Sequence, residues 1–260
     1  MRASLRARLR AAPDGELLAG VFVKTPALPV IELLARSGID FVCFDSEHAG
    51  FGRRELDECL AIARALGLPA LVRVAEAGAA PILQALDGGA EGVVVPHVDG
   101  AEAAARVAAW SRFGPGGRGY AGSTRAAGFG TLPMREVLAA SRKETLVVVQ
   151  IEDPAGLAEA DAIAATPGVD ALFFGAADLA VGMGLENSAV PEIRAALDRV
   201  AASARAAGKP LAAFTAATEG LGELAARGVR LAFVGSDQSL LLAGGRRLAA
   251  AAQATRSEES

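Results

Sequence analysis

Polar side chains that could do chemistry follow several short apolar runs of this chain. The run FVCF is followed by DSEH at 45–48, Gln150 and Glu152 end a second run, and Asp178 follows a third run after three small residues. Gln150 and Glu152 are two positions apart, so on a strand their side chains face the same side. Two carboxylates among oxygen-bearing neighbours suit a hard divalent ion that keeps several waters, such as Mg or Mn. Glu152 and Asp178 are therefore the predicted metal ligands.

Each of these carboxylates also has a plain structural interpretation. Asp178 could cap the N-terminus of a helix that follows Gly175. Glu152 could form a salt bridge at the rim of the fold. Their placement after neighbouring strands favours the metal site over these alternatives.

His48 is one of only two histidines in the chain, and Asp45 lies three residues before it. If both stand at one strand end, Asp45 can hold the imidazole and fix its tautomer, which gives a base poised near neutral pH. A lone histidine is more often structural than catalytic. Glu47 could orient a metal-bound water or face the solvent.

Arg73 ends the apolar run Pro69–Val72 and needs an anionic partner there. A protein carboxylate is the simple partner, and a substrate carboxylate or a developing enolate is the functional one. The second histidine, His97, could contact substrate or form a rim hydrogen bond. The glycine-rich stretch at 114–120 lacks the lysine of a phosphate loop, so a mobile substrate loop is the preferred interpretation.

Short strand-type runs alternate with alanine- and leucine-rich helical runs along the whole chain. We expect strands at Leu17–Val23, Phe41–Asp45, Ala70–Val74, Gly92–Pro96, Leu146–Glu152, Ala171–Gly175, Leu211–Thr215 and Leu231–Val234. We expect helices at Pro29–Arg36, Arg54–Ala65, Ala79–Leu86, Ala101–Ser111, Gly156–Ala165, Pro191–Ala207, Thr218–Ala226 and Gln238–Ala252. Eight such pairs predict one (β/α)8 TIM barrel over residues 1–260. Its site lies at the carboxyl ends of the strands, where Gly175, Ala176 and Ala177 would line it.

Composition excludes several other classes of protein. The formal net charge is −4, with 26 basic and 30 acidic residues, and no basic footprint for nucleic acid is present. No apolar run is suited to spanning a membrane. Two cysteines form no disulfide framework, so a cytoplasmic location is expected. We read no signal peptide at the start, one long loop at 113–133, and a frayed polar tail at 253–260.

The chain resembles the HpcH/HpaI-type class II pyruvate aldolases, which include enzymes that cleave 2-keto-3-deoxy sugar acids and hydroxylated keto-dicarboxylates. The matching stretches are FDSEHAG at 44–50, PALVRV at 69–74, LDGGAEGVVVPHV at 86–98, GPGGRGY at 114–120, VVVQIED at 147–153 and FFGAADLA at 173–180. They cover most of the predicted barrel and occur in the order typical of the family. This resemblance implies a barrel of the phosphoenolpyruvate/pyruvate type.

The resemblance also implies roles for single residues. Glu152 and Asp178 match the ligands of a divalent metal (Mg, Mn or Co), and His48 with Asp45 resembles the acid–base dyad. Arg73 matches the residue that holds the keto oxygen and enolate. Two further matches concern substrate binding: Gln150 as a hydrogen-bonder in the site, and Asp87, whose counterpart reaches the site of a neighbouring subunit. The family assembles as hexamers with an exchanged C-terminal helix, so a homo-oligomer, trimer or hexamer, is implied.

Three departures from the family pattern concern the substrate more than the reaction. Ser46 stands where glycine is usual, and His97 stands where methionine is frequent. Phe22 and Lys24 replace a first strand end that usually carries tryptophan. These positions lie where the acceptor aldehyde would bind.

The expected reaction is reversible cleavage of a 4-hydroxy-2-keto acid to pyruvate and an aldehyde through a pyruvate enolate. A lyase acting on CoA esters of the citramalyl or malyl type is an alternative, but the chain has no convincing basic patch for such a cofactor. A non-catalytic keto-acid-binding barrel is another, yet none of His48, Arg73, Glu152 and Asp178 is lost. A Schiff-base route would need Lys24, since Lys143 and Lys209 precede strands.

Overall fold

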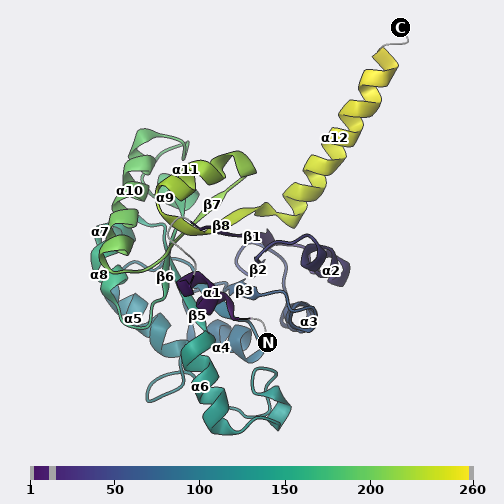
Figure 1. Cartoon of the computed structure of the whole chain (residues 1–260). Helices are drawn as coiled ribbons and strands as arrows, with labels where there is room; N and C mark the ends of the chain where they lie inside the picture. Colours follow the sequence, from purple (N-terminus) through teal and green to yellow (C-terminus); the bar gives the residue numbers. More distant parts are fainter. Residues whose placement is uncertain (1–2, 12–15, 258–260) are drawn as a thin grey trace.

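Eight parallel strands form a closed barrel with helices around it (Figure 1). The computed structural model describes residues 3–11 and 16–257. Each strand pairs with the next along the chain, and the last pairs with the first. The strands are β1 (Leu18–Val23), β2 (Phe41–Asp45), β3 (Ala70–Arg73), β4 (Gly92–Val95), β5 (Leu146–Ile151), β6 (Ala171–Phe174), β7 (Leu211–Thr215) and β8 (Val229–Ser236). The predicted (β/α)8 barrel is confirmed.

Helices precede, connect and follow the strands, and most of them surround the barrel (Figure 1). They are α1 (Leu5–Ala11), α2 (Leu28–Arg36), α3 (Arg53–Ala65), α4 (Ala79–Asp87), α5 (Ala101–Trp110), α6 (Met134–Glu144), α7 (Pro154–Ala158), α8 (Ala160–Ala165), α9 (Ala176–Gly182), α10 (Pro191–Ala206), α11 (Leu221–Ala226) and α12 (Asp237–Ser257), with the 3-10 turns η1 (Gly128–Gly130) and η2 (Thr218–Gly220). Within residues 3–11 and 16–257, no helix is long and apolar enough to cross a membrane.

Alternate residues of each strand point into the barrel and form an interior cluster distinct from the layer under the helices. This cluster contains Leu18, Phe22, Phe41, Cys43, Leu71, Val94, Leu146, Val148, Ala171, Phe173, Ala212, Leu231 and Phe233, together with Leu5 and Leu9 of α1. Because side chains alternate with a period of two, the next inward positions after β1, β2, β3, β5 and β6 can be identified, and they are polar or small. They are Lys24, Asp45, Arg73, Gln150 and Gly175. The strand pattern itself thus brings these residues to the carboxyl end of the barrel.

Helix α1 lies at the opposite, amino end of the barrel. The backbone N–H of Leu5 donates to Glu91, and the guanidinium of Arg6 binds the carboxylate of Asp170; these two acidic residues stand directly before β4 and β6. Arg112 forms another ion pair with Asp170, with 2.8 Å between Nη2 and Oδ2. This end is therefore filled by side chains and ion pairs, which leaves the carboxyl end for a site.

Most differences from the predicted elements lie in the helices. The helix expected at Gly156–Ala165 is two helices, α7 and α8, and the structure adds α1, α6 and α9. The long loop at 113–133 is confirmed as largely irregular, with one short turn, η1. The frayed end expected at 253–260 is wrong for residues 253–257, which continue α12; residues 258–260 lie outside the described part.

Helix α12 projects away from the barrel in Figure 1. Four of its leucines are exposed: Leu240, Leu241, Leu242 and Leu248. Together with Val30 and Leu33 of α2, its first half borders a cavity of about 890 Å³.

Candidate active site

Asp45 and Arg73 form a two-pronged ion pair at the carboxyl ends of β2 and β3. Nε of Arg73 donates to Oδ1 of Asp45 at 2.9 Å, and Nη2 donates to Oδ2 at 2.7 Å. Residues 45 and 73 are register partners on neighbouring strands, which explains why their side chains meet. Phe22 lies against the guanidinium, 4.6 Å from ring centroid to Cζ. Planar, paired hydrogen bonding of this kind fixes the arginine in one orientation.

The same aspartate also orders the loop that follows β2. Its Oδ1 accepts the backbone N–H groups of Glu47 at 3.3 Å and His48 at 3.2 Å. Although burial alone would raise the pKa of Asp45, the hydrogen bonds and charge of Arg73 outweigh it and hold that pKa below its usual value. The carboxylate is therefore the charged anchor of this corner of the site.

The predicted contact between Asp45 and the imidazole of His48 is wrong. Asp45 holds the backbone of His48, and the ring lies instead near Glu47, with 3.7 Å between Nε2 and Oε2. The reason is geometric: Arg73 already occupies both oxygens of the aspartate from the neighbouring strand. The side chain of His48 is about half exposed.

Glu152 is the buried carboxylate at the centre of the site. Its Oε1 accepts the backbone N–H of His97 at 2.9 Å, and its Oε2 accepts the amide of Gln150 at 2.6 Å. Only 2% of the residue is exposed, and burial raises the pKa of Glu152 to about 7. The negative charge of nearby Asp178 contributes in the same direction. Among the described residues, its ion-pair partner is the half-exposed imidazole of His97, with 3.8 Å between Nδ1 and Oε1, and a carboxylate held in this way suits a cation.

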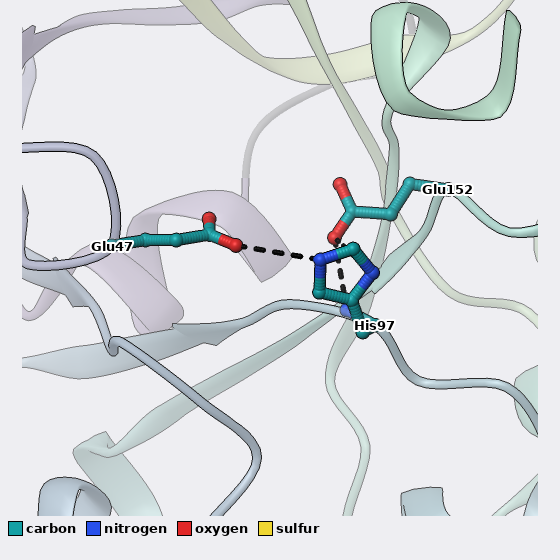
Figure 2. A group of neighbouring side chains, drawn as sticks. All are labelled: Glu47, His97 and Glu152. Carbon is teal, nitrogen blue, oxygen red and sulfur yellow. Dashed lines mark hydrogen bonds and ion pairs between the residues drawn. The ribbon is translucent and has the colours of Figure 1, made fainter. Parts of the chain in front are cut away.

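His97 places its ring between two acidic groups. Its Nδ1 lies 2.9 Å from Oδ2 of Asp153, and its Nε2 lies 3.6 Å from Oε1 of Glu47. Burial alone would lower the pKa of His97, but the hydrogen bond to Asp153 and the charges of Glu152 and Glu47 outweigh it and raise that pKa. Glu47, His97 and Glu152 each offer a ligand atom within 4.8 Å of the others (Figure 2).

A cavity of about 520 Å³ opens at this end of the barrel, a volume suited to a small-molecule site. It is lined by Phe22, Lys24, Arg73, Gln150, Glu152, Phe173, Gly175, Ala176, Ala177, Asp178, Ser188, Phe214, Ala216, Gly235, Ser236 and Ser239. Arg73, Gln150, Glu152 and Asp178 thus come together, as do the three small residues at 175–177. Asp178 stands in the first turn of α9 behind the cap residue Gly175, so it is not the cap itself.

The residues present fit a divalent cation. Glu152 and Asp178 supply carboxylate oxygens in one cavity, and Glu47 and His97 lie beside Glu152. Among the described residues, the buried Oε1 of Gln150 accepts no hydrogen bond. At Gly175, a Cβ would lie 2.5 Å from Cβ and Oε2 of Glu152, so glycine leaves the carboxylate its space. A set rich in carboxylate oxygens favours hard ions such as Mg or Mn.

Asp87 lies elsewhere on this chain. It ends α4 and borders a separate cavity of about 570 Å³ beside Arg125 and Phe129. Its Oδ1 is 3.9 Å from Nε of Arg118. Within one chain, the structure does not bring Asp87 to the cavity of Arg73 and Glu152.

The sequence did not assign Glu47 and His97 to the site. Glu47 had two open interpretations, and His97 could equally have formed a rim contact. Each lies two positions after the last residue of its strand, in DSEH and in PH, and that position was the available signal. The left-handed backbone of His97, with φ of 53°, was not readable from the sequence.

Known proteins resemble this chain over most of its length. Residues 18–243 match the model of the HpcH/HpaI aldolase/citrate lyase family. A 5-keto-4-deoxy-D-glucarate aldolase of Salmonella arizonae is 36% identical over 220 residues, 84% of this chain and 85% of that protein. A hydroxypyruvate/pyruvate aldolase of Paraburkholderia phytofirmans is 34% identical over 212 residues, 78% of this chain and 80% of that protein.

A solved structure has the same architecture over nearly its full length. The crystal structure of an HpcH/HpaI aldolase/citrate lyase family protein from Burkholderia cenocepacia J2315 superposes with a TM-score of 0.89 at 35% identity, covering 97% of this chain and 98% of that one. The family match spans the barrel from β1 into α12 and includes the residues of the site. The chain belongs to the HpcH/HpaI aldolase/citrate lyase family.

Proposed function

We propose that this family member, a carbon–carbon lyase, cleaves a 4-hydroxy-2-keto acid reversibly to pyruvate and an aldehyde. One observation carries the proposal: an arginine fixed by a buried aspartate and a buried, cation-ready glutamate line the same cavity. A developing enolate needs positive charge that is in place before the bond breaks. Arg73 meets that need without rearrangement.

Glu152 and Asp178 would hold the divalent cation, Mg, Mn or Co, with Glu47 and His97 near enough to complete or orient the ligand set. Bound there, the cation supplies Lewis-acid polarisation of the keto group. Gln150 donates to Glu152 and keeps that carboxylate in one position. Gly175, Ala176 and Ala177 leave room for the substrate next to it.

The reaction then divides between Arg73 and His48. His48, directly or through a water, accepts the proton of the 4-hydroxyl group. The bond between C3 and C4 breaks, its electron pair passes to the keto-acid fragment as an enolate, and the aldehyde leaves. Arg73 stabilises the negative oxygen of that enolate, and protonation at C3 gives pyruvate.

Assays of pyruvate release on a panel of 4-hydroxy-2-keto acids test this proposal. We expect turnover of at least one member, with a free aldehyde as the second product. A chain that releases no pyruvate from the whole panel, but cleaves a citramalyl- or malyl-CoA ester, would contradict the proposal. The panel must include substrates with and without a second carboxylate, since the departures at Phe22, Lys24 and His97 lie where the aldehyde would bind.

We also propose that the chain acts as a homo-oligomer, a trimer or hexamer. The exposed leucines of α12 and the cavity beside α2 support this, because an isolated chain would leave them in water. Asp87, remote from the cavity within one chain, would then serve a neighbouring subunit. Light scattering of the purified protein and of Leu241→Glu tests the assembly: we expect a defined oligomer that Leu241→Glu dissociates, and a monomeric parent protein would contradict it.

A further inference from the structure

Lys24 lies where the arginine–aspartate pair meets the cavity. It follows β1, lines the cavity, and its side chain is 29% exposed. Its Nζ lies 3.3 Å from Oδ2 of Asp45, the same oxygen that accepts from Nη2 of Arg73. One fully buried carboxylate is therefore shared by two cations.

Lys24 adds a second basic side chain to the carboxylates around Arg73. All three nitrogens of the guanidinium face carboxylates: two contact Asp45, and Nη1 lies 3.2 Å from Oε2 of Glu47. Glu47 also has the imidazoles of His48 and His97 nearby, at 3.7 and 3.6 Å. Asp45, among the described residues, has only Arg73 and Lys24 as ion-pair partners. Lys24 supplies the second positive charge, and charges this close interact strongly when partly shielded from water.

The backbone of Lys24 is held by Asp237, which directly follows β8, the strand that pairs with β1 and closes the barrel. Oδ1 of Asp237 accepts the N–H of Lys24 at 2.8 Å, and its Oδ2 accepts the N–H of Thr25 at 3.1 Å. Asp237 is buried and is the first residue of α12. The lysine is thus fixed in place at its main chain and at its ammonium group.

We propose that Lys24 is a positioning residue that acts through Asp45 to keep the positive charge of Arg73 available to the enolate, and that Asp237 fixes Lys24 for this role. This inference rests on the proposed function. The ammonium group of Lys24 acts as a charge only and forms no covalent bond to substrate. Without the ammonium group, Arg73 keeps its hydrogen bonds, but its positive charge is offset by two carboxylates and less of it acts on the enolate.

Exchange of the pyruvate methyl protons with deuterium, followed by NMR, measures enolate formation without an aldehyde. With Mn or Mg present, we expect Lys24→Met to slow exchange about tenfold and Lys24→Arg to restore most of it. Mn affinity, measured separately by titration, should stay equal or become tighter in Lys24→Met, because a positive charge has left the cavity. Lys143→Met, an exposed lysine on α6, is the control and should change neither quantity.

Asp237→Asn separates placement from charge. We expect slower exchange with unchanged Mn affinity, since Lys24 keeps its charge but loses one of its fixed contacts. The inference is overturned if Lys24→Met exchanges at the parent rate, or if it loses exchange, Mn affinity and thermal stability together, as a structural residue would. A parent protein that does not exchange pyruvate protons would instead contradict the proposed function, and this inference with it.

Discussion

The backbone N–H of His97 donates to Glu152 across 2.9 Å while the φ angle of His97 is 53°, in the left-handed region. The turn after β4 is thus bent so that a main-chain donor meets the buried carboxylate. Non-glycine residues pay a conformational cost for this backbone. A cost retained beside the candidate metal ligand indicates that orienting Glu152 matters more than relaxing the turn.

The first prediction concerns this strained turn. The free energy of unfolding of His97→Gly, measured with urea, should exceed that of His97→Ala by about 1 kcal/mol, because glycine adopts positive φ freely. The amide that binds Glu152 is retained in both variants, so the pair isolates the backbone cost. Equal stabilities of the two variants would contradict a left-handed conformation at position 97.

The second prediction distinguishes the candidate ligands. Glu152→Gln and Asp178→Asn should each weaken Mn binding by about 100-fold or more, since both lose a charged oxygen ligand. Glu47→Gln should weaken it far less if Glu47 only orients a water. Titration of all three variants measures this, with Glu102→Gln, an exposed residue of α5, as the control. Loss of Mn binding in Glu47→Gln but not in Asp178→Asn would place the ion among Glu47, His97 and Glu152 instead.

The third prediction concerns the shape of the Arg73 side chain. Arg73→Lys should lower kcat/KM for keto-acid cleavage by about 100-fold, because an ammonium group cannot reproduce the paired donors that meet Asp45 while leaving charge for substrate. Thermal unfolding should confirm that the barrel still forms. Near-parental kcat and KM in this variant would show that Arg73 has a structural role only.

The fourth prediction follows from the lowered pKa of Asp45. Its ionised form is stabilised in the folded chain by Arg73, despite burial, so its contribution to stability is present above the ordinary aspartate pKa and is lost as pH falls through the lower, folded value. Urea unfolding of the parent and Asp45→Asn should therefore differ most near neutral pH and converge in acid. A constant difference from neutral to acid pH would contradict the ionised pair.

Much of the fold followed from the sequence because barrel strands are buried on both faces. Continuously apolar runs such as Val147–Val149 are typical of strands covered on both faces. The expected bounds of β2 and β7 are those observed. The start of β8 was placed two residues late because Arg230 interrupts its apolar pattern. Helix α6 was missed because it follows a long irregular loop and has a largely polar surface.

The site was less predictable than the fold because its partners come from different strands. Spacing suggested that Asp45 would hold the ring of His48, three residues away. The register of β2 against β3 instead places Arg73 on both carboxylate oxygens. The clamp of Asp237 on Lys24 joins residues 213 positions apart and depends on closure of the barrel, which no local pattern encodes.

The most direct test of the metal-dependent mechanism compares how a chelator and borohydride each affect pyruvate release. We expect a chelator to abolish pyruvate release from a 4-hydroxy-2-keto acid that the protein cleaves, and Mg, Mn or Co to restore it. Borohydride with pyruvate should leave the activity intact. Glu152 and Asp178 supply the cation site in this view, while Lys24 is paired with Asp45 and free of covalent chemistry. Covalent trapping at Lys24, or full activity after exhaustive chelation, would contradict the metal-dependent mechanism.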